Sequence, residues 1–462
     1  MTLLVGYGVA SIGENAAYAT FYLFFVFFLT NVAGLAPAVA GTISAVAVLW
    51  DAVTDPTIGH ISDNLRWRFG KRRPLFLMFS VPLGIAVMLL FTNINLSGTA
   101  KVVYFLGINM FFWLFFTACD VPYIALGGEL TDDFNERIRV RAYASFFMAL
   151  GGFLGLAATM VVVKYFTNKL GSPDAGWQAM GALFGSLIAL CYLIAWAATR
   201  GWEPTPDAAP SAAKTEHRHF LKDYLGILSL KPNRFLLAVT FVFNLGFSSI
   251  NTAYPFLALY VIGLNEAQLS FTLLVYSIAN SMLVPVIGWV ATRLGKKETL
   301  ALAILLNGGS LIAFQFLPLT LVSILVYLVF IAISQAAFWT LSYSMAFDIT
   351  EVDEFKNGSR KEGTICASIG LLYKLGLAFG MWLSGALLQF IGYNAELAQQ
   401  APETLAGIKS ICTLVPGIIV FGGGLIALYY PLTRERFEAV KRALAAKRAG
   451  EPFTTEGFAE IL

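Results

Sequence analysis

The sequence predicts an all-α membrane protein whose twelve transmembrane helices form two pseudo-symmetric bundles of six. Hydrophobic residues make up 58% of the 462 residues and charged residues only 13%, whereas a soluble domain carries roughly 25% charged residues. The apolar residues gather into long uniform runs rather than into the short alternating segments of a membrane β-barrel. Motifs also recur between the two halves of the chain, which indicates an internal repeat.

Twelve apolar runs are long enough to cross a bilayer, which takes about 20 helical residues. They lie at residues 6–32, 38–63, 74–94, 101–128, 141–164, 176–199, 234–262, 267–291, 299–317, 320–347, 363–391 and 405–430. The grouping predicts a first bundle at residues 1–200, a connector at 201–233, a second bundle at 234–430 and a tail at 431–462. Within the connector, residues 220–228 have the composition of a short interfacial helix.

The basic residues lie in loops on one side of the predicted membrane. They fill the tail and follow the second, fourth, eighth and tenth runs, where they include Arg66, Arg68, Lys71, Arg72, Arg73, Arg137, Arg139, Arg141, Arg293, Lys296, Lys297, Lys356, Arg360 and Lys361. The opposite loops are short and carry few basic residues, among them Lys164 and Lys169. By the positive-inside rule both termini are expected in the cytoplasm. The sequence therefore predicts a multi-pass protein of the bacterial cytoplasmic membrane.

Similar motifs occupy equivalent positions in the two halves. Pro56-Thr-Ile-Gly59 is followed by Gly70-Lys-Arg-Arg73, and Pro285-Val-Ile-Gly288 is followed by Gly295-Lys-Lys297. Residues 131–136, after the fourth run, resemble residues 350–354, after the tenth. Parallel repeats around a site in the bilayer midplane are typical of transporters that work by alternating access.

Five charged side chains lie deep inside apolar runs at about the same predicted depth: Glu14, Asp51, Asp55, Asp120 and Lys374. A charge in the middle of a span costs at least about 2.5–3.5 kcal/mol on insertion scales. Charges retained in spans commonly mark the pathway or the binding site of a charged species. We therefore expect a site near the midplane. The alternative is a buried polar network that only holds the helices together.

Two of the runs bring oxygen ligands to this level. Asp51 and Asp55 are four residues apart and share one face of a helix, and Thr117 and Asp120, three apart, share a face of another. Carboxylate and hydroxyl oxygens are ligands that hard cations prefer. The sequence predicts a cation site at Asp51, Asp55, Thr117 and Asp120, with Na⁺ possible at the three aspartates. Carboxylates this close repel each other unless a proton or a cation neutralises them.

Several motifs together resemble one transporter family. They are Trp50-Asp-Ala-Val-Thr-Asp-Pro56, Arg68-Phe-Gly-Lys-Arg-Arg-Pro74, Asp120-Val-Pro122, Asp348-Ile-Thr-Glu-Val-Asp-Glu354 and Arg360-Lys-Glu-Gly363. These segments are similar to those of the glycoside–pentoside–hexuronide:cation symporters, a branch of the major facilitator superfamily. The resemblance covers nearly the whole chain in order. It implies the major facilitator fold and a coupling ion, Na⁺ or H⁺, at the predicted cation site.

The resemblance and the depth of polar and aromatic residues also indicate where a solute binds. The substrate-binding residues that we expect are Glu14, Asn15, Tyr123, Ile124, Ser145, Trp339 and Lys374. Trp339 and Lys374 match melibiose permease, the best-known member of the family. Asn15, Ile124 and Ser145 stand where that protein has an acid, a tryptophan and an arginine. The polar clamp for galactosides is mostly missing, so we expect ion coupling with a different specificity.

These features predict a secondary active transporter that couples entry of Na⁺ or H⁺ to uptake of a glycoside, sugar or sugar acid. The alternative is a sodium-coupled symporter of a lysolipid or another amphipathic anion. We expect no enzyme and no cofactor beyond the coupling ion, because no nucleophile–base pair or nucleotide-binding loop accompanies the carboxylates. The expected partners are the solute, the coupling cation and the lipid bilayer, without nucleic acid, and the expected state is a monomer.

Charged residues at the cytoplasmic ends of the runs predict a gate. Basic and acidic members are expected to pair there: Arg137, Arg293 and Arg360 with Asp348, Glu351 and Asp353. Exposed ion pairs contribute only about 0–1 kcal/mol each, which suits a latch that has to open. The alternative is that these are solvated loop charges that only fix the topology.

Overall fold

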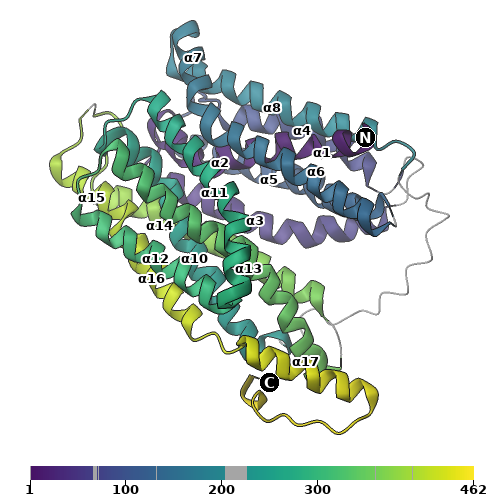
Figure 1. The fold of residues 1–462 in the computed structure, drawn as a ribbon. Coiled ribbons are helices and arrows are strands. Elements are labelled where there is room, and N and C mark those ends of the chain that lie inside the picture. The colour runs from purple at the N-terminus through teal and green to yellow at the C-terminus, as the bar shows by residue number, and fades with distance from the viewer. Residues whose placement is uncertain are drawn as a thin grey trace. The chain divides into compact units, whose positions relative to one another are not determined.

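The computed structural model describes residues 2–65, 70, 72–131, 133–202, 226–358, 361–397 and 399–461. Helices account for nearly all of its regular structure, as Figure 1 shows. Twelve helical stretches are long and apolar enough to cross a membrane, from Leu3–Asn31 to Pro402–Leu428. The predicted all-α membrane fold with twelve spans is confirmed. The span boundaries differ from the predicted ones by six residues or fewer, except that the tenth span ends at Asn357, ten residues later than predicted.

The first six spans are built from eight helices: α1 (Thr2–Gly8), α2 (Ala10–Asn31), α3 (Pro37–Asn64), α4 (Arg73–Leu90), α5 (Gly98–Glu129), α6 (Phe134–Phe153), α7 (Thr159–Leu170) and α8 (Pro173–Ala198). A π-helical segment at Leu154–Ala158 joins α6 to α7 within one span. The start of α8 follows from its sequence, because the Ser172 hydroxyl accepts a hydrogen bond from the Ala175 N–H and Pro173 opens the first turn.

The second six spans and the tail contain α10 (Lys231–Phe256), α11 (Glu266–Leu294), α12 (Lys296–Phe316), α13 (Leu321–Asn357), α14 (Glu362–Phe390), α15 (Pro402–Cys412), α16 (Leu414–Leu428) and α17 (Arg434–Ala449). A π-helical segment at Leu257–Val261 extends α10. The Thr320 and Ser323 side chains form a capping box at the start of α13. The predicted interfacial helix at 220–228 lies mostly outside the described residues.

The chain divides into two compact units. Unit 1 comprises Met1–Ala213, Asn251–Ser277 and Met381–Ile408, and unit 2 comprises Lys214–Ile250, Ile278–Gly380 and Lys409–Leu462. Unit 1 therefore combines the N-terminal half of the chain with one end each of α10, α11 and α14. The division that we predicted at 201–233 would leave those ends with the second half.

The same pair of spans packs closely in each half. In unit 1, α4 lies along α8, and in unit 2, α12 lies along α16 (Figure 1). A Cβ atom on Gly84 would lie 2.5 Å from the Gly185 carbonyl oxygen, and one on Gly308 would lie 2.5 Å from the Phe421 nitrogen. Glycine lets helix backbones approach this closely in a membrane. The third and sixth spans of both halves thus meet through glycine, as a parallel repeat requires.

Arg72 ties together the ends of the helices that carry the candidate cation site. Its guanidinium donates to both carboxylate oxygens of Glu129 at 3.0 and 2.7 Å, and to Asp63 Oδ1 at 3.1 Å. Asp63 lies at the end of α3, and Glu129 lies at the end of α5. Bidentate arginine–carboxylate pairs fix geometry strongly. The pairing therefore holds α3 and α5 in register next to the start of α4.

Candidate cation and solute site

The centre of the site is a contact between α3 and α5 inside unit 1. Asp51 is 3% exposed, Asp55 is half-buried and Thr117 is 1% exposed. The Thr117 hydroxyl lies 2.6 Å from Asp51 Oδ1 and 3.1 Å from Asp55 Oδ1. The predicted grouping of these three residues is thereby realised in space. Their pairing across two helices follows from the i, i+4 spacing of the aspartates and the packing of α3 on α5.

A threonine hydroxyl carries a single proton, and here it lies within reach of two carboxylates. Donation to Asp51 leaves a hydroxyl lone pair facing Asp55 across 3.1 Å. Two facing oxygen lone pairs repel unless a proton or a cation lies between them. The arrangement is therefore suited to a small hard cation, which carboxylate and hydroxyl oxygens ligate.

The remaining predicted cation ligand, Asp120, pairs with a different acid. Its carboxyl group shares a hydrogen bond with that of Glu14 on α2, which is only 8% exposed. A hydrogen bond between two carboxyl groups needs one proton, because an ionised carboxylate only accepts. In the described part of the chain, no group of three or more His, Cys, Asp or Glu side chains is disposed to hold a metal ion. Sodium binding by the aspartate trio stays a prediction.

Tyr123 lies in the packed interior of unit 1. It is 2% exposed, its hydroxyl lies 2.9 Å from Ser11 Oγ, and its ring stacks on Tyr7 at 4.4 Å between centroids. The Tyr7 hydroxyl in turn donates to the Tyr123 carbonyl at 3.0 Å. Neither Tyr7 nor Ser11 was predicted as a partner of Tyr123, since contacts between helices depend on packing. Substrate contact by Tyr123 stays a prediction.

The three positions that depart from the family pattern differ in exposure. Ile124 follows Asp120 by four residues on α5 and is 51% exposed, so both lie on one face of that helix. Ser145 is exposed on α6, and Asn15 is half-buried on α2 beside Glu14. All three belong to unit 1. Their roles in solute binding stay predictions.

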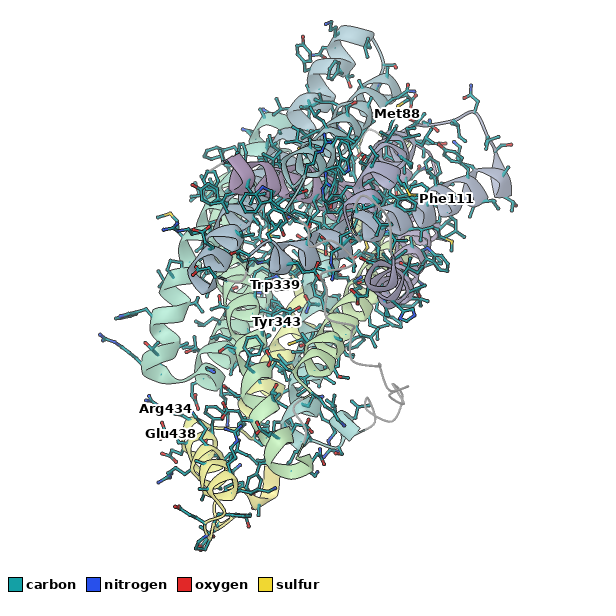
Figure 2. The ribbon with its side chains drawn as sticks, turned by 90° about the vertical axis from the view of Figure 1, so that its right-hand side faces the viewer. Met88, Phe111, Trp339, Tyr343, Arg434 and Glu438 are labelled. Atoms are coloured by element: carbon teal, nitrogen blue, oxygen red, sulfur yellow. The ribbon has the colours of Figure 1, made fainter. Side chains whose placement is uncertain are left out.

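Unit 2 contributes a cluster of aromatic rings. Trp339 on α13 is 40% exposed and lies nearly parallel to Tyr343, with centroids 6.1 Å apart and an interplanar angle of 11° (Figure 2). The Tyr373 ring of α14 meets Trp339 edge-on at 5.1 Å. Lys374 follows directly on α14 and is half-buried. We did not predict Tyr343 as a site residue, although its spacing of four residues from Trp339 indicates that the two share one helix face.

The predicted gate residues have the following surroundings. The Lys296 ammonium pairs with Asp348 at 2.7 Å, and the Arg293 guanidinium lies 4.3 Å from the centroid of the Trp289 ring. Asp353 is buried and accepts a hydrogen bond from Asn357 at 2.6 Å, and Glu351 is half-buried. Arg360 and the side chain of Arg137 lie outside the described residues. Lys296 was predicted as a basic loop residue but not as a gate residue, and the gate stays a prediction.

Residues 6–434 match the family described as MFS/sugar transport protein. The chain belongs to this family. It is 29% identical to a glucuronide carrier protein homolog of Escherichia coli K12 over 95% of this chain and 94% of that one. It is 26% identical to the isoprimeverose transporter of Lactiplantibacillus pentosus over 92% of this chain and 87% of the other. These matches confirm the predicted glycoside–pentoside–hexuronide:cation symporter relationship.

Two further comparisons extend this placement. The sodium-dependent lysophosphatidylcholine symporter 1 of Gallus gallus is 26% identical over 91% of this chain and 84% of its own length. A solved structure of a bacterial homolog to the human lysosomal transporter Spinster superposes with a TM-score of 0.71 at 13% identity, covering 95% of this chain and 96% of the other. The structural match shows the fold alone. Family and relatives together establish a multi-pass membrane transporter of the symporter type.

Proposed function

We propose that the protein carries a glycoside, sugar or sugar acid into the cell together with Na⁺ or H⁺. The observation that carries the proposal is the Thr117 hydroxyl held between Asp51 and Asp55 in the interior of unit 1. Two carboxylates around one hydroxyl provide oxygen ligands for a small cation and acceptors for a proton. Binding of the cation or proton changes the charge of this site, and the proposed coupling links that change to solute binding.

The proposed solute class is supported by the aromatic cluster of unit 2. The exposed Trp339 ring, backed by Tyr343 and Tyr373, offers a flat apolar face to a sugar ring. Lys374 next to Tyr373 supplies a positive charge for the carboxylate of a sugar acid. The names of the E. coli and L. pentosus relatives support glucuronides and glycosides as the classes to test first.

We propose that the protein lies in the bacterial cytoplasmic membrane with both termini inside. The support is the run of basic residues that follow even-numbered spans, and Arg434, Arg436, Lys441 and Arg442 on α17. Lys164, one of the few basic residues expected on the outer side, is balanced by Glu266 at 3.0 Å. We keep the monomer as the working state for the experiments.

A lysolipid or another amphipathic anion is the second candidate solute. It is favoured by one observation, the exposed apolar Ile124 at a position where melibiose permease has a tryptophan. The Gallus gallus relative supports testing it. The glycoside proposal ranks first because two bacterial relatives of similar coverage are sugar-derivative carriers by name.

The test uses purified protein in proteoliposomes and compares parent, Asp55→Asn and Asp174→Asn. Asp174 is the matched control, since it undergoes the same chemical change at the start of α8, away from the site. A screen of glucuronides, pentosides and lysolipids first finds a solute that exchanges by counterflow. With it, Asp55→Asn is expected to lower gradient-driven uptake by about 100-fold, because a charged hydrogen-bond partner contributes about 1.5–3 kcal/mol.

Gradient-driven uptake by Asp55→Asn at the parental rate would refute the proposed coupling. Loss of uptake in Asp174→Asn as well would assign the effect to folding rather than to the site. Counterflow by the parent with lysolipids and with none of the sugar derivatives would replace the first solute class by the second.

A further inference from the structure

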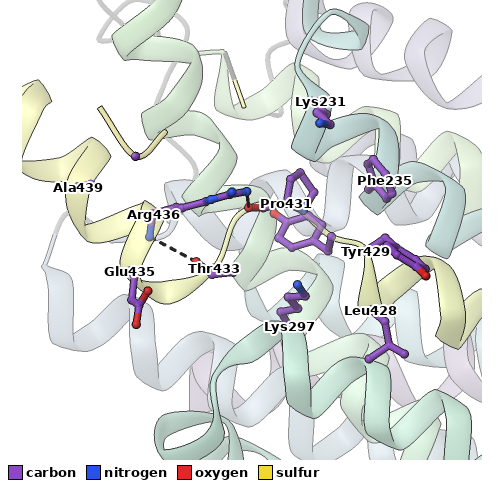
Figure 3. A pocket seen from close by; sticks show the side chains of 12 residues that line it. Lys231, Phe235, Lys297, Leu428, Tyr429, Pro431, Thr433, Glu435, Arg436 and Ala439 are labelled. Carbon is purple, nitrogen blue, oxygen red and sulfur yellow. Dashed lines mark hydrogen bonds between the residues drawn. The ribbon is translucent and has the colours of Figure 1, made fainter. Parts of the chain in front are cut away.

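A cavity of about 720 Å³ lies in unit 2 where three spans end (Figure 3). Lys231 at the start of α10, Lys297 at the start of α12 and Leu428 at the end of α16 contribute to its wall. The segment that leads from α16 into α17, and Arg436 within α17, complete it. All of these residues lie outside the candidate transport site.

The cavity is rich in positive charge. Its wall holds Lys231, Lys297 and Arg436 against a single acid, Glu435. Arg436 is already engaged, because it donates to the Pro431 carbonyl at 3.0 Å and lies 3.4 Å from Glu460. Among the described residues, the ammonium groups of Lys231 and Lys297 have no ion-pair or hydrogen-bond partner. Two charges of one sign facing one space favour an anionic ligand.

Tyr430 forms part of the same wall. The residue is 2% exposed, and its hydroxyl is buried without a hydrogen-bond partner among the described residues. Burial raises the pKa of this hydroxyl well above its usual range, so Tyr430 stays a neutral donor. A buried polar group without a partner is unfavourable. The hydroxyl itself is closed off from the cavity, so Tyr430 contributes to the packing of the wall rather than a contact for a ligand.

The rim of the cavity is apolar and lies at a membrane boundary. Tyr429 is 74% exposed and Leu428 is 44% exposed. Leu428 is the last residue of the span Pro402–Leu428, and Tyr429 follows it directly. Tyrosine is enriched at the level of lipid headgroups. The neighbouring helix α17 carries six basic and two acidic residues, which gives this helix a net positive charge.

We propose that this cavity binds the phosphate of an anionic phospholipid, with Lys231 and Lys297 as its ionic contacts. Basic pockets between membrane helices bind anionic headgroups, and lysine is a common point-charge ligand of phosphate. The apolar rim favours a phospholipid over free phosphate, since Leu428 and Tyr429 give an acyl chain a surface to lie on.

The bound lipid would also stabilise the docked position of α17. This helix is held on α13 by the ion pair of Arg448 with Glu354 and by the Lys447 ammonium, which donates to the Phe355 carbonyl at 2.6 Å. Lys231 lies on α10, Lys297 lies on α12, and Arg436 lies on α17. A headgroup among them links α17 to α10 and α12. Binding to the native state alone raises thermal stability.

The test measures binding of short-chain phosphatidylglycerol to the purified full-length protein in a neutral detergent, by native mass spectrometry and by thermal shift. The variants are Lys231→Gln/Lys297→Gln and the control Lys441→Gln/Arg442→Gln, which removes two charges of α17 that do not line the cavity. Each lysine near a headgroup is expected to contribute about 5-fold, so the cavity variant should bind about 30-fold more weakly. The control should bind like the parent.

Short-chain phosphatidylcholine and inorganic phosphate serve as further arms, and both are expected to bind far more weakly than phosphatidylglycerol. Equal loss in the cavity variant and the control would overturn the proposal in favour of diffuse surface attraction. Inorganic phosphate that binds as tightly as the lipid would overturn the choice of a phospholipid. If the double variant does not fold, Lys297→Arg and Lys297→Gln replace it, and the proposal requires that only the arginine retains binding.

Discussion

At the scale of single residues, the Thr117 hydroxyl is the group on which the proposed coupling depends. It has one proton to donate, and two carboxylates lie within 2.6 and 3.1 Å of it. The hydroxyl oxygen can also ligate a cation while its O–H donates a hydrogen bond to Asp51. Serine keeps this chemistry, and alanine removes it. Thr117 is therefore a sharper probe than the aspartates, because replacing it alters no charge.

Thr117→Ala is expected to weaken cation dependence by about 10-fold or more, since a hydrogen bond to a charged group contributes about 1.5–3 kcal/mol. Thr117→Ser should retain the parental value. The measurement is the cation concentration that gives half-maximal uptake. Thr54→Ala is the matched control, because the Thr54 hydroxyl donates to the Asp51 backbone carbonyl at 3.1 Å rather than to a carboxylate. Parental cation dependence in Thr117→Ala would contradict this role of the hydroxyl.

Sequence spacing predicted part of the site because the helix repeat fixes which residues share a face. Asp51 and Asp55 follow this rule, and Thr117 meets them as expected. The hydrogen bond of Glu14 with Asp120 was not predicted, because it depends on how α2 lies against α5. The contacts of Tyr7 and Ser11 with Tyr123 were not predicted for the same reason, since residues that meet from different helices show no shared spacing in the sequence.

At the scale of elements, hydropathy located the spans but not their internal breaks. The first span is two helices that meet at Val9, and two spans contain π-helical segments. Such segments need one extra residue in a turn and leave hydropathy unchanged. The helix α17 was also missed, because its apolar face is narrow, with Val440, Ala443 and Leu444 as its buried residues.

One end of unit 1 is joined by polar contacts between elements that are distant in the sequence. The Asn31 side-chain oxygen at the end of α2 accepts hydrogen bonds from Tyr260 at 3.0 Å and from Tyr393 at 2.5 Å. The Ala38 N–H of α3 donates to the Gln389 side chain at 3.2 Å. These contacts hold the ends of α10 and α14 against the N-terminal helices. We expect a carrier that works by alternating access to break these hydrogen bonds when this end of unit 1 opens.

The double variant Tyr260→Phe/Tyr393→Phe is expected to open this end more often. Two lost hydrogen bonds contribute about 1 kcal/mol each, so the open population should rise by about 30-fold. A cysteine placed at Ala258, which is fully buried, reports opening through its rate of maleimide labelling in a background without the native cysteines. Tyr104→Phe is the control, because the Tyr104 hydroxyl bonds only to Leu89 on the neighbouring α4. Equal labelling in both variants would exclude this role of the hydrogen bonds.

At the scale of the whole molecule, the two units carry different parts of the proposed function. The carboxylates and Thr117 belong to unit 1, whereas Trp339, Tyr343 and Lys374 belong to unit 2. The packing of α4 on α8 and of α12 on α16 repeats the same architecture in both halves. A repeated scaffold with different side chains lets one half specialise in the ion and the other in the solute.

This division of roles predicts how the two ligands affect each other in equilibrium binding. By linkage, the factor by which the cation strengthens solute binding must equal the factor by which the solute strengthens cation binding, typically about 5–150-fold. Trp339→Ala should weaken solute binding by up to about 10-fold, since aromatic stacking contributes about 0.5–1.5 kcal/mol beyond the buried area. Cation affinity measured without solute should not change, because Trp339 lies in the other unit from Thr117. Trp339→Phe is the conservative control and should retain most of the solute affinity. Calorimetric titration of each ligand, with and without the other, measures all four affinities. Weaker cation binding by Trp339→Ala in the absence of solute would show that the two units do not divide the roles in this way.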